Sequence, residues 1–199
     1  MPKVGLNREK IVAQAAEVAD EAGLGGLTLA AVAKRCGVSP PGLYKHVASL
    51  EAVRRDVAVL AVRELAAILA LATTGRSGRD ALGAAADAYR GYALAHPGRA
   101  ASLAAPPAEG DEEHNAATAQ AGQVFAAVML GYRIEGDDLI DAIRLLRVTM
   151  HGFAMLESAG GFGLPQSVDA TFARLVDMLD GAFRSWGGRR ASGSVRHSL

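Results

Sequence analysis

Residues 39–46 combine side chains of the kinds that suit contact with double-stranded DNA. Ser39 precedes two prolines and Gly42, and small groups at the leading end of a helix allow it to enter a major groove deeply. Proline rings there, at Pro40 and Pro41, can contact thymine methyl groups. The next three residues, Tyr44, Lys45 and His46, supply a hydroxyl, a cation and an imidazole for nearby phosphates.

Three short helices are expected to position this segment. A first helix fits residues 7–22, capped by Asn7 and ended by the glycines that follow. Thr28 is placed to cap a second helix that Gly37 stops, and Ser39 to cap a third with Pro40 in its first turn. Helix N-termini present free N–H groups and positive dipole to a phosphate. Residues 1–48 therefore predict a helix-turn-helix DNA-binding domain.

Residues 8–55 resemble the DNA-binding domain of the TetR family of bacterial transcriptional regulators. The resemblance is carried by residues 27–53, LTLAAVAKRCGVSPPGLYKHVASLEAV, with the family's opening Thr, Ala-Val-Ala core, Gly-Val-Ser turn and Leu-Tyr-x-His. It implies phosphate contacts for one set of residues, Thr28, Ser39, Tyr44 and His46, and groove contacts for another, Pro40, Pro41, Gly42 and Lys45. One departure is Leu50, where the family often has a phosphate-binding Lys; Arg54 and Arg55 lie nearby.

The rest of the chain predicts an antiparallel helical bundle, so the expected fold class is all-α. Hydrophobic residues make up 50% and aromatic residues 5% of the chain, which leaves Ala, Leu and Val to pack the core. The pattern predicts helices over residues 49–72, 78–96, 99–103, 116–132, 137–158 and 167–186. Residues 49–186 form a ligand-binding and dimerisation domain in this interpretation, and the Gly-, Ser- and Arg-rich residues 187–199 a disordered tail.

The last two predicted helices carry more apolar surface than one monomer needs. In residues 137–158 the apolar positions extend well around the cylinder, and Gly152 would permit close approach of another helix. Pairing both helices with their copies would give a four-helix homodimer interface. Residues 146–165 also resemble a TetR subclass with a His-Gly signature, here His151 and Gly152. That resemblance implies a C-terminal domain that binds a small molecule and dimerises.

Aromatic and Met side chains on the bundle helices predict an apolar effector pocket with a few hydroxyl groups, lined by Tyr89, Tyr92, Phe125, Met129, Tyr132, Met150 and Phe153. The alternative is that these residues are plain core. His151 is either part of a solvated or interface stripe or a partner for a ligand carboxylate. Cys36 is expected to be a small buried residue, and the acidic run from Asp111 to His114 a solvated loop.

Charge and motifs exclude several classes of protein. Lys and Arg together number 21, equal to Asp and Glu, but residues 1–60 hold eight bases against six acids, the sign expected of a unit that meets a polyanion. We find no membrane-length apolar run and no secretory signal, and the single Cys fits a reducing cytoplasm. Enzyme motifs, metal-ligand clusters and cofactor sites are also missing, so we expect neither an enzyme nor a cofactor.

The leading hypothesis is a ligand-responsive repressor that binds a near-palindromic operator as a homodimer and is released by a small, mainly hydrophobic effector. The alternative keeps the fold without the small-molecule switch: control by concentration or a protein partner, or action as an activator.

Overall fold

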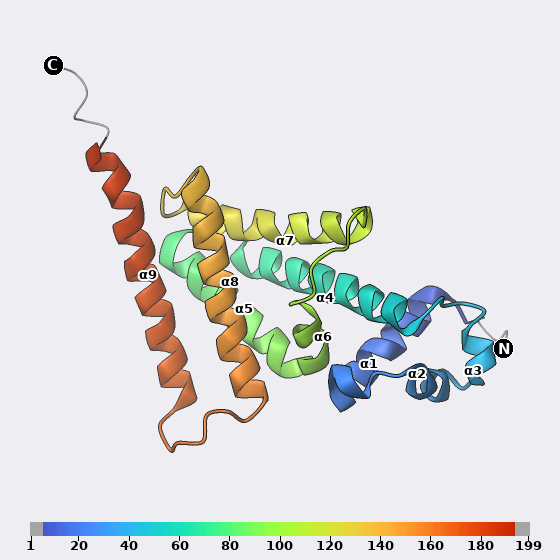
Figure 1. The fold of residues 1–199 in the computed structure, drawn as a ribbon. Coiled ribbons are helices and arrows are strands. Elements are labelled where there is room, and N and C mark those ends of the chain that lie inside the picture. Colours follow the sequence, from blue (N-terminus) through green and yellow to red (C-terminus); the bar gives the residue numbers. More distant parts are fainter. Residues whose placement is uncertain (1–5, 194–199) are drawn as a thin grey trace. The chain divides into compact units, whose positions relative to one another are not determined.

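The computed structural model describes residues 6–193, with the side chains of residues 6–186. All regular secondary structure in this part of the chain is helical, which confirms the expected all-α class (Figure 1). In chain order the helices are α1 (Arg8–Gly26), α2 (Leu29–Cys36), α3 (Pro40–Leu43), α4 (Leu50–Thr73), α5 (Gly78–Ala95), α6 (Pro97–Ser102), α7 (Glu112–Leu130), α8 (Asp137–Ser158) and α9 (Val168–Gly193).

The chain divides into two compact units. Unit 1 comprises Met1–Glu64 and Ala95–Thr118, and unit 2 comprises Leu65–Leu94 and Ala119–Leu199. Helices α4 and α7 therefore each contribute to both units. Unit 1 contains the segment 1–48 predicted to bind DNA, together with the first half of α4, helix α6 and the start of α7.

The core of unit 1 forms under α1, α2, α3 and the start of α4. Ile11, Leu27, Val32 and Leu43 are each at most 1% exposed and belong to one apolar cluster. The helix ends follow the sequence: the Asn7 side chain accepts a hydrogen bond from the Lys10 amide at 2.9 Å, as expected of an N-cap. The chain bends at Gly23 (φ 70°) before α1 resumes, so this helix ends at Gly26, four residues beyond the expected range of 7–22.

Helix α6 packs closely on α1 within unit 1. A Cβ atom at Gly98 would lie 2.0 Å from the Ala19 carbonyl oxygen, so only glycine allows this approach. Asp20 of α1 accepts a hydrogen bond from the Arg99 amide at 2.8 Å. The Asp20 carboxylate thereby satisfies an amide in the first turn of α6. The N-cap residue of α6, His96, makes no capping hydrogen bond with its side chain.

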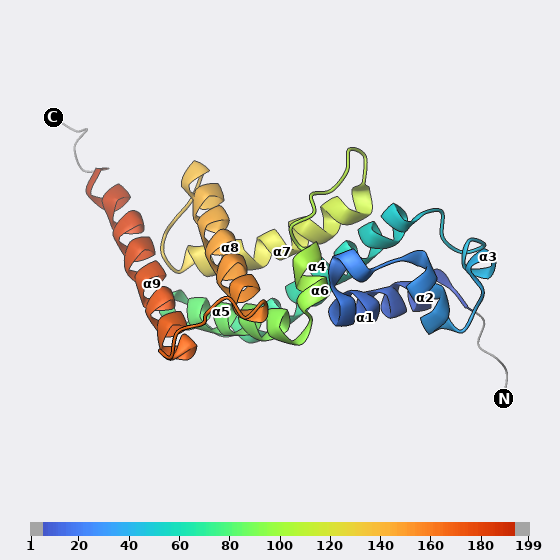
Figure 2. The same ribbon diagram turned by 60° about the horizontal axis from the view of Figure 1, so that its bottom comes forward.

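Unit 2 is built from α5 and α8, the second halves of α4 and α7, and α9. Its most deeply buried side chains include Leu82, Met129, Leu146, Met150 and Phe183. Helices α8 and α9 lie side by side in both views and are joined by the glycine-containing loop expected from the sequence (Figures 1 and 2).

Helices α7 and α9 also differ from the sequence-based expectation at one end each. Helix α7 begins at Glu112, four residues before the expected start, because Asp111 accepts a hydrogen bond from the His114 amide at 3.0 Å and acidic residues occupy the first turn. Helix α9 runs to Gly193, past the expected end at Trp186 and into the segment predicted to be disordered. Residues 194–199 of that segment lie outside the described residues.

Candidate DNA-binding face and effector sites

The helix-turn-helix holds its predicted contact residues on a buried apolar base. Leu43 and Val47 are 1% and 8% exposed, and the Leu43 carbonyl accepts the Val47 amide at 3.3 Å, so helical bonding continues for one turn beyond α3. Gly37 ends α2 with φ 68°, a conformation that favours glycine. This turn separates α2 from α3 and fixes the face that α3 presents.

The predicted contact residues on and around α3 are accessible. Tyr44 is 58% exposed although it follows fully buried Leu43. Gly42 is half-buried, and the remaining predicted residues are exposed: Thr28, Ser39, Pro40, Pro41, Lys45 and His46. A Cβ at Gly42 would meet no atom closer than 3.4 Å, so the fold itself does not require glycine there. The sequence places polar and small groups outward and apolar groups inward.

The two predicted capping hydroxyls behave differently. Thr28 Oγ1 accepts the Ala31 amide at 3.1 Å, which leaves its own proton available to donate to a phosphate oxygen. Ser39 occupies the N-cap position of α3, but its side chain makes no capping hydrogen bond. Prolines at the next two positions carry no N–H, and the Gly42 amide bonds to the Ser39 carbonyl at 2.9 Å instead.

Most arginines of unit 1 are committed to ion pairs. Arg55 follows Leu50, the position at which the TetR pattern often has a lysine, by five residues in α4. It forms ion pairs with Asp56, Asp111 and Glu113. Hydrogen bonds from Arg55 hold the pKa of Asp111 and of Glu113 below the ordinary carboxyl values. Arg54, by contrast, donates to the Leu24 carbonyl at 3.3 Å and forms no ion pair with the described residues.

The acidic run expected to be a solvated loop is therefore structural, and that expectation is wrong. Asp111 Oδ2 accepts from Arg55 Nε at 2.7 Å, and Glu113 accepts from Arg55 and Arg63. His114 is only 2% exposed. The sequence did carry a signal, because Asp111 followed by two glutamates is a typical start of a helix.

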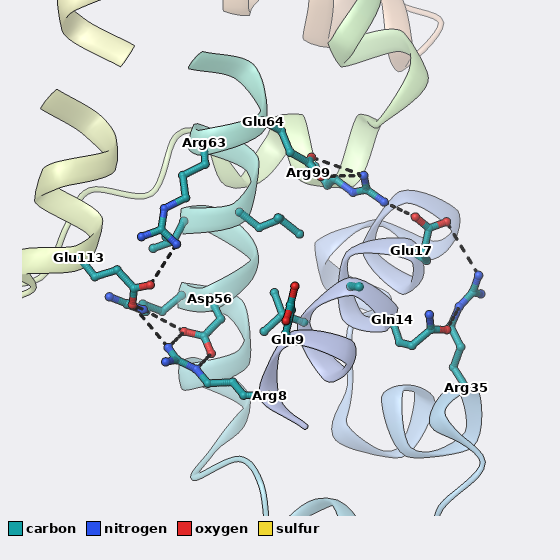
Figure 3. A pocket seen from close by; sticks show the side chains of 15 residues that line it. Arg8, Glu9, Gln14, Glu17, Arg35, Asp56, Arg63, Glu64, Arg99 and Glu113 are labelled. Carbon is teal, nitrogen blue, oxygen red and sulfur yellow. Dashed lines mark hydrogen bonds and ion pairs between the residues drawn. The ribbon is translucent and has the colours of Figure 1, made fainter. Parts of the chain in front are cut away.

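A charged cavity of about 920 Å³ lies in unit 1 between α1 and α4 (Figure 3). Its acidic and basic side chains point toward one another in pairs, among them Arg8 with Asp56 and Arg99 with Glu17. Burial alone would raise the pKa of Asp56, but hydrogen bonds from Arg8 and Arg55 lower it. Because its charges are matched internally, this cavity shows no preference for a charged ligand.

The seven predicted effector residues lie in the core of unit 2. All are buried: Tyr89, Tyr92, Phe125, Met129, Tyr132, Met150 and Phe153. Their polar atoms are engaged, since the Tyr132 hydroxyl donates to Asp180 at 2.7 Å and the Tyr89 hydroxyl lies 3.0 Å from His151 Nδ1. Burial raises the pKa of Tyr89 to about 12. The same cause, with the positive charge of Arg147, lowers the pKa of His151 and so favours the neutral imidazole.

Phe153 borders a cavity in unit 2. The space measures about 370 Å³ and lies between Phe153 and the loop that joins α8 to α9. The Phe153 ring packs against Phe162 and Phe172, with centroids 4.9 and 5.1 Å away. The Arg90 guanidinium lies 4.7 Å from the Phe172 centroid, held there by Glu157 and Asp169.

A third cavity, of about 520 Å³, lies in unit 1 and was not expected from the sequence. It is bordered by α4, by α6 with the loop that follows it, and by the first turn of α7. No group of His, Cys, Asp and Glu residues that could hold a metal ion occurs among the described residues. No helix in that part of the chain is long and apolar enough to cross a membrane.

Comparisons with known proteins match both halves of the chain. Residues 11–57 match the family described as bacterial regulatory proteins, tetR family, and residues 82–179 match the tetracyclin repressor-like C-terminal domain. The HTH-type transcriptional regulator Rv0681 of Mycobacterium tuberculosis is 37% identical over 172 residues, 86% of this chain and 78% of its own. The regulator YobS of Bacillus subtilis is 34% identical over 168 residues, 81% of this chain and 84% of its own.

Solved structures share the fold at lower identity. A TetR variant from Acinetobacter baumannii AYE in complex with minocycline superposes with a TM-score of 0.71 at 20% identity, covering 92% of this chain and 98% of that one. BioQ with its double-stranded DNA operator gives a TM-score of 0.65 at 20% identity, covering 88% and 99%. At this identity the two structures support the fold alone.

Proposed function

The chain belongs to the TetR family of bacterial transcriptional regulators, and from this premise we propose that it is a ligand-responsive repressor. Members of this family are transcription factors and not enzymes, as expected from the sequence. In the proposal a homodimer binds a near-palindromic operator and releases it when a small effector binds. In this proposal the operator is DNA of the bacterial cell, so the protein acts in the cytoplasm.

The observation that carries the DNA-binding proposal is the exposed polar set around α3 on its buried base. Tyr44, Lys45 and His46 follow one another in a turn that Leu43 and Val47 anchor. We assign phosphate contacts to the hydroxyls and imidazole of Thr28, Ser39, Tyr44 and His46. The groove is assigned to Pro40, Pro41, Gly42 and Lys45, where side chains are small or flexible enough to approach base edges.

The homodimer is supported by apolar surface on α8 and α9. Leu145, Val148 and Met178 are 52%, 70% and 63% exposed. A Cβ added at Gly152 of α8 or Gly181 of α9 would meet no atom within 4 Å, so glycine at neither position is needed by the single chain. Four such helices from two copies would bury this surface. In this proposal the dimer presents its two α3 segments to successive major grooves, about 34 Å apart on the DNA.

For the effector, the sequence-based proposal is the core of unit 2 around Tyr89 and Tyr132. A ligand there would have to displace packed aromatic rings or take over a hydroxyl that already has a partner. This packing is the observation behind the second candidate, a regulator of the same fold without a small-molecule switch. Finding a ligand that enters this core would decide between the two.

The test is DNA binding of the purified protein to its own promoter region, followed by fluorescence anisotropy over a range of salt concentrations. We expect the specific duplex to bind at least about 10³-fold more tightly than random DNA, at one dimer per site. The double variant Tyr44→Phe, Lys45→Ala should lose most of this preference. Equal binding of the wild type to all duplexes would contradict the proposal.

A further inference from the structure

The cavity of about 520 Å³ in unit 1 has the composition of a small-molecule site. Its volume falls within the range of about 300–1,000 Å³ usual for ligand pockets. The walls consist mainly of methyl and methylene groups, and its residues are Leu24, Arg54, Arg55, Ala58, Ala101, Ser102, Ala104, Ala105, Pro106, Ala108 and His114. Short alanine side chains leave room that longer residues would fill.

His114 gives this cavity an unmet polar requirement. Its side chain is almost fully buried, and its Nε2 atom has no hydrogen-bond partner among the described residues. Buried polar atoms without a partner are rare in folded proteins, and each one calls for an explanation such as a bound molecule. A ligand in the cavity with a hydrogen-bonding head group can supply the missing partner.

The charges around the cavity select the sign of that head group. Every ionisable residue that lines it is a base, and no Asp or Glu is among the lining residues. The Arg55 guanidinium already forms ion pairs with three carboxylates of the protein. Arg54 bonds only weakly to the Leu24 carbonyl at 3.3 Å, so most of its donors remain for a ligand. The charged cavity between α1 and α4 differs, because acids match its bases there.

We propose that this cavity binds a small amphipathic carboxylate. The apolar tail packs among Ala58, Ala101 and Ala105, and the carboxylate accepts hydrogen bonds from His114 and Arg54. This site is separate from the aromatic core of unit 2 and takes a ligand of defined charge. The inference concerns binding and holds whether or not the ligand controls an operator.

Octanoate is the probe, titrated into the full-length protein by isothermal titration calorimetry beside octanamide and octylamine. These compounds share the same eight-carbon chain, so differences between them report on the head group. We expect saturable binding of octanoate, binding of octanamide weaker by about tenfold or more, and no saturable binding of the cationic octylamine.

Two variants locate the site. Ala105→Leu adds bulk from an exposed position on the cavity wall and should abolish octanoate binding without disturbing the core. His114→Phe keeps a ring but removes both nitrogens, and should weaken octanoate by about tenfold while leaving octanamide changed less. Ala116→Leu, at an exposed α7 position outside the cavity, is the matched control and should bind like the wild type.

Three results would overturn the inference: no saturable octanoate binding up to about 10 mM, equal affinity for octanoate and octanamide, or wild-type binding by Ala105→Leu. Anisotropy with promoter DNA on the same samples, without any carboxylate, reports on the proposed function separately. Failure of DNA binding with intact octanoate binding would contradict that function and leave this inference standing.

Discussion

Replacing Gly98 with alanine should push α6 away from α1. The added Cβ would lie 2.0 Å from the Ala19 oxygen, 2.1 Å from its carbonyl carbon and 2.5 Å from the Asp20 nitrogen. All three are backbone atoms in the interior of a helix, so no side-chain rotation relieves the overlap. Because ordinary contact begins near 3.4 Å, the two helices must separate by about 1.4 Å.

The free-energy cost of this separation has two parts. Overpacking of this kind costs about 1–3 kcal/mol. The same movement would stretch the 2.8 Å hydrogen bond from the Arg99 amide to Asp20 beyond bonding range, which costs about 1 kcal/mol more. The sum is about 2–4 kcal/mol, or a fall in the melting temperature of about 5–15 °C for a chain of this size.

The assay is thermal unfolding followed by circular dichroism, with Gly91→Ala as the matched control. Gly91 is exposed on α5 and a Cβ there meets no atom within 4 Å, so alanine should stabilise its helix by about 0.5–1 kcal/mol. The two glycine-to-alanine changes should thus shift the melting temperature in opposite directions. If Gly98→Ala melts at or above the wild-type temperature, the close approach of α6 to α1 is refuted.

Three other predictions concern separate parts of the chain. The midpoint of the His151 imidazole in an NMR titration should lie below 6.5, and Arg147→Gln should raise it. Because the folded state favours the neutral ring, its contribution to the free energy of unfolding is complete above pH 6.5 and is lost as the pH falls through the midpoint. Val148→Asp should convert the proposed dimer to a monomer in light scattering, whereas Leu71→Asp, at an 80% exposed position on α4, should leave the mass unchanged. Gly42→Ala should keep the wild-type melting temperature within about 2 °C but weaken operator binding about tenfold, and unchanged affinity would contradict close groove contact.

The helices were predictable because their boundaries depend on neighbouring residues. Asn7 and Thr28 accept hydrogen bonds from amides three residues ahead, and Gly37 provides the left-handed turn that the sequence indicated. The limits of α8, Asp137–Ser158, coincide with the expected range, because Gly136 (φ 62°) precedes the helix and two aspartates occupy its first turn. Burial of Leu43 and Val47 also follows from their spacing, and with it the exposure of Tyr44 and Lys45.

The partners of polar side chains could not be read from the sequence. Asp20 and Arg99 meet although 79 residues separate them, and Arg55 meets Asp111 across 56 residues. Such pairs depend on how helices pack, which periodicity does not specify. The tyrosines of unit 2 show the same limit. The Tyr132 hydroxyl was predicted to line an effector pocket, and in the structure it donates a hydrogen bond to Asp180.

The net charge of the first 60 residues has the sign expected of a DNA-binding protein, but the structure shows that some of these bases are paired within the chain. Ion pairs within unit 1 occupy three of the eight bases, Arg8, Arg35 and Arg55. Lys34, Lys45 and Arg54 are the exposed bases of that segment that form no ion pair among the described residues. Arg54 is also assigned to the carboxylate in the cavity, so three such cations in each protomer of the proposed dimer are an upper limit. At most about six phosphates are then neutralised, and the logarithm of operator affinity should fall with the logarithm of salt concentration at a slope no steeper than about −5. If all eight bases of each protomer contacted phosphate, the slope would approach about −14, and a measured value near that limit would refute the assignment of the arginines to internal ion pairs.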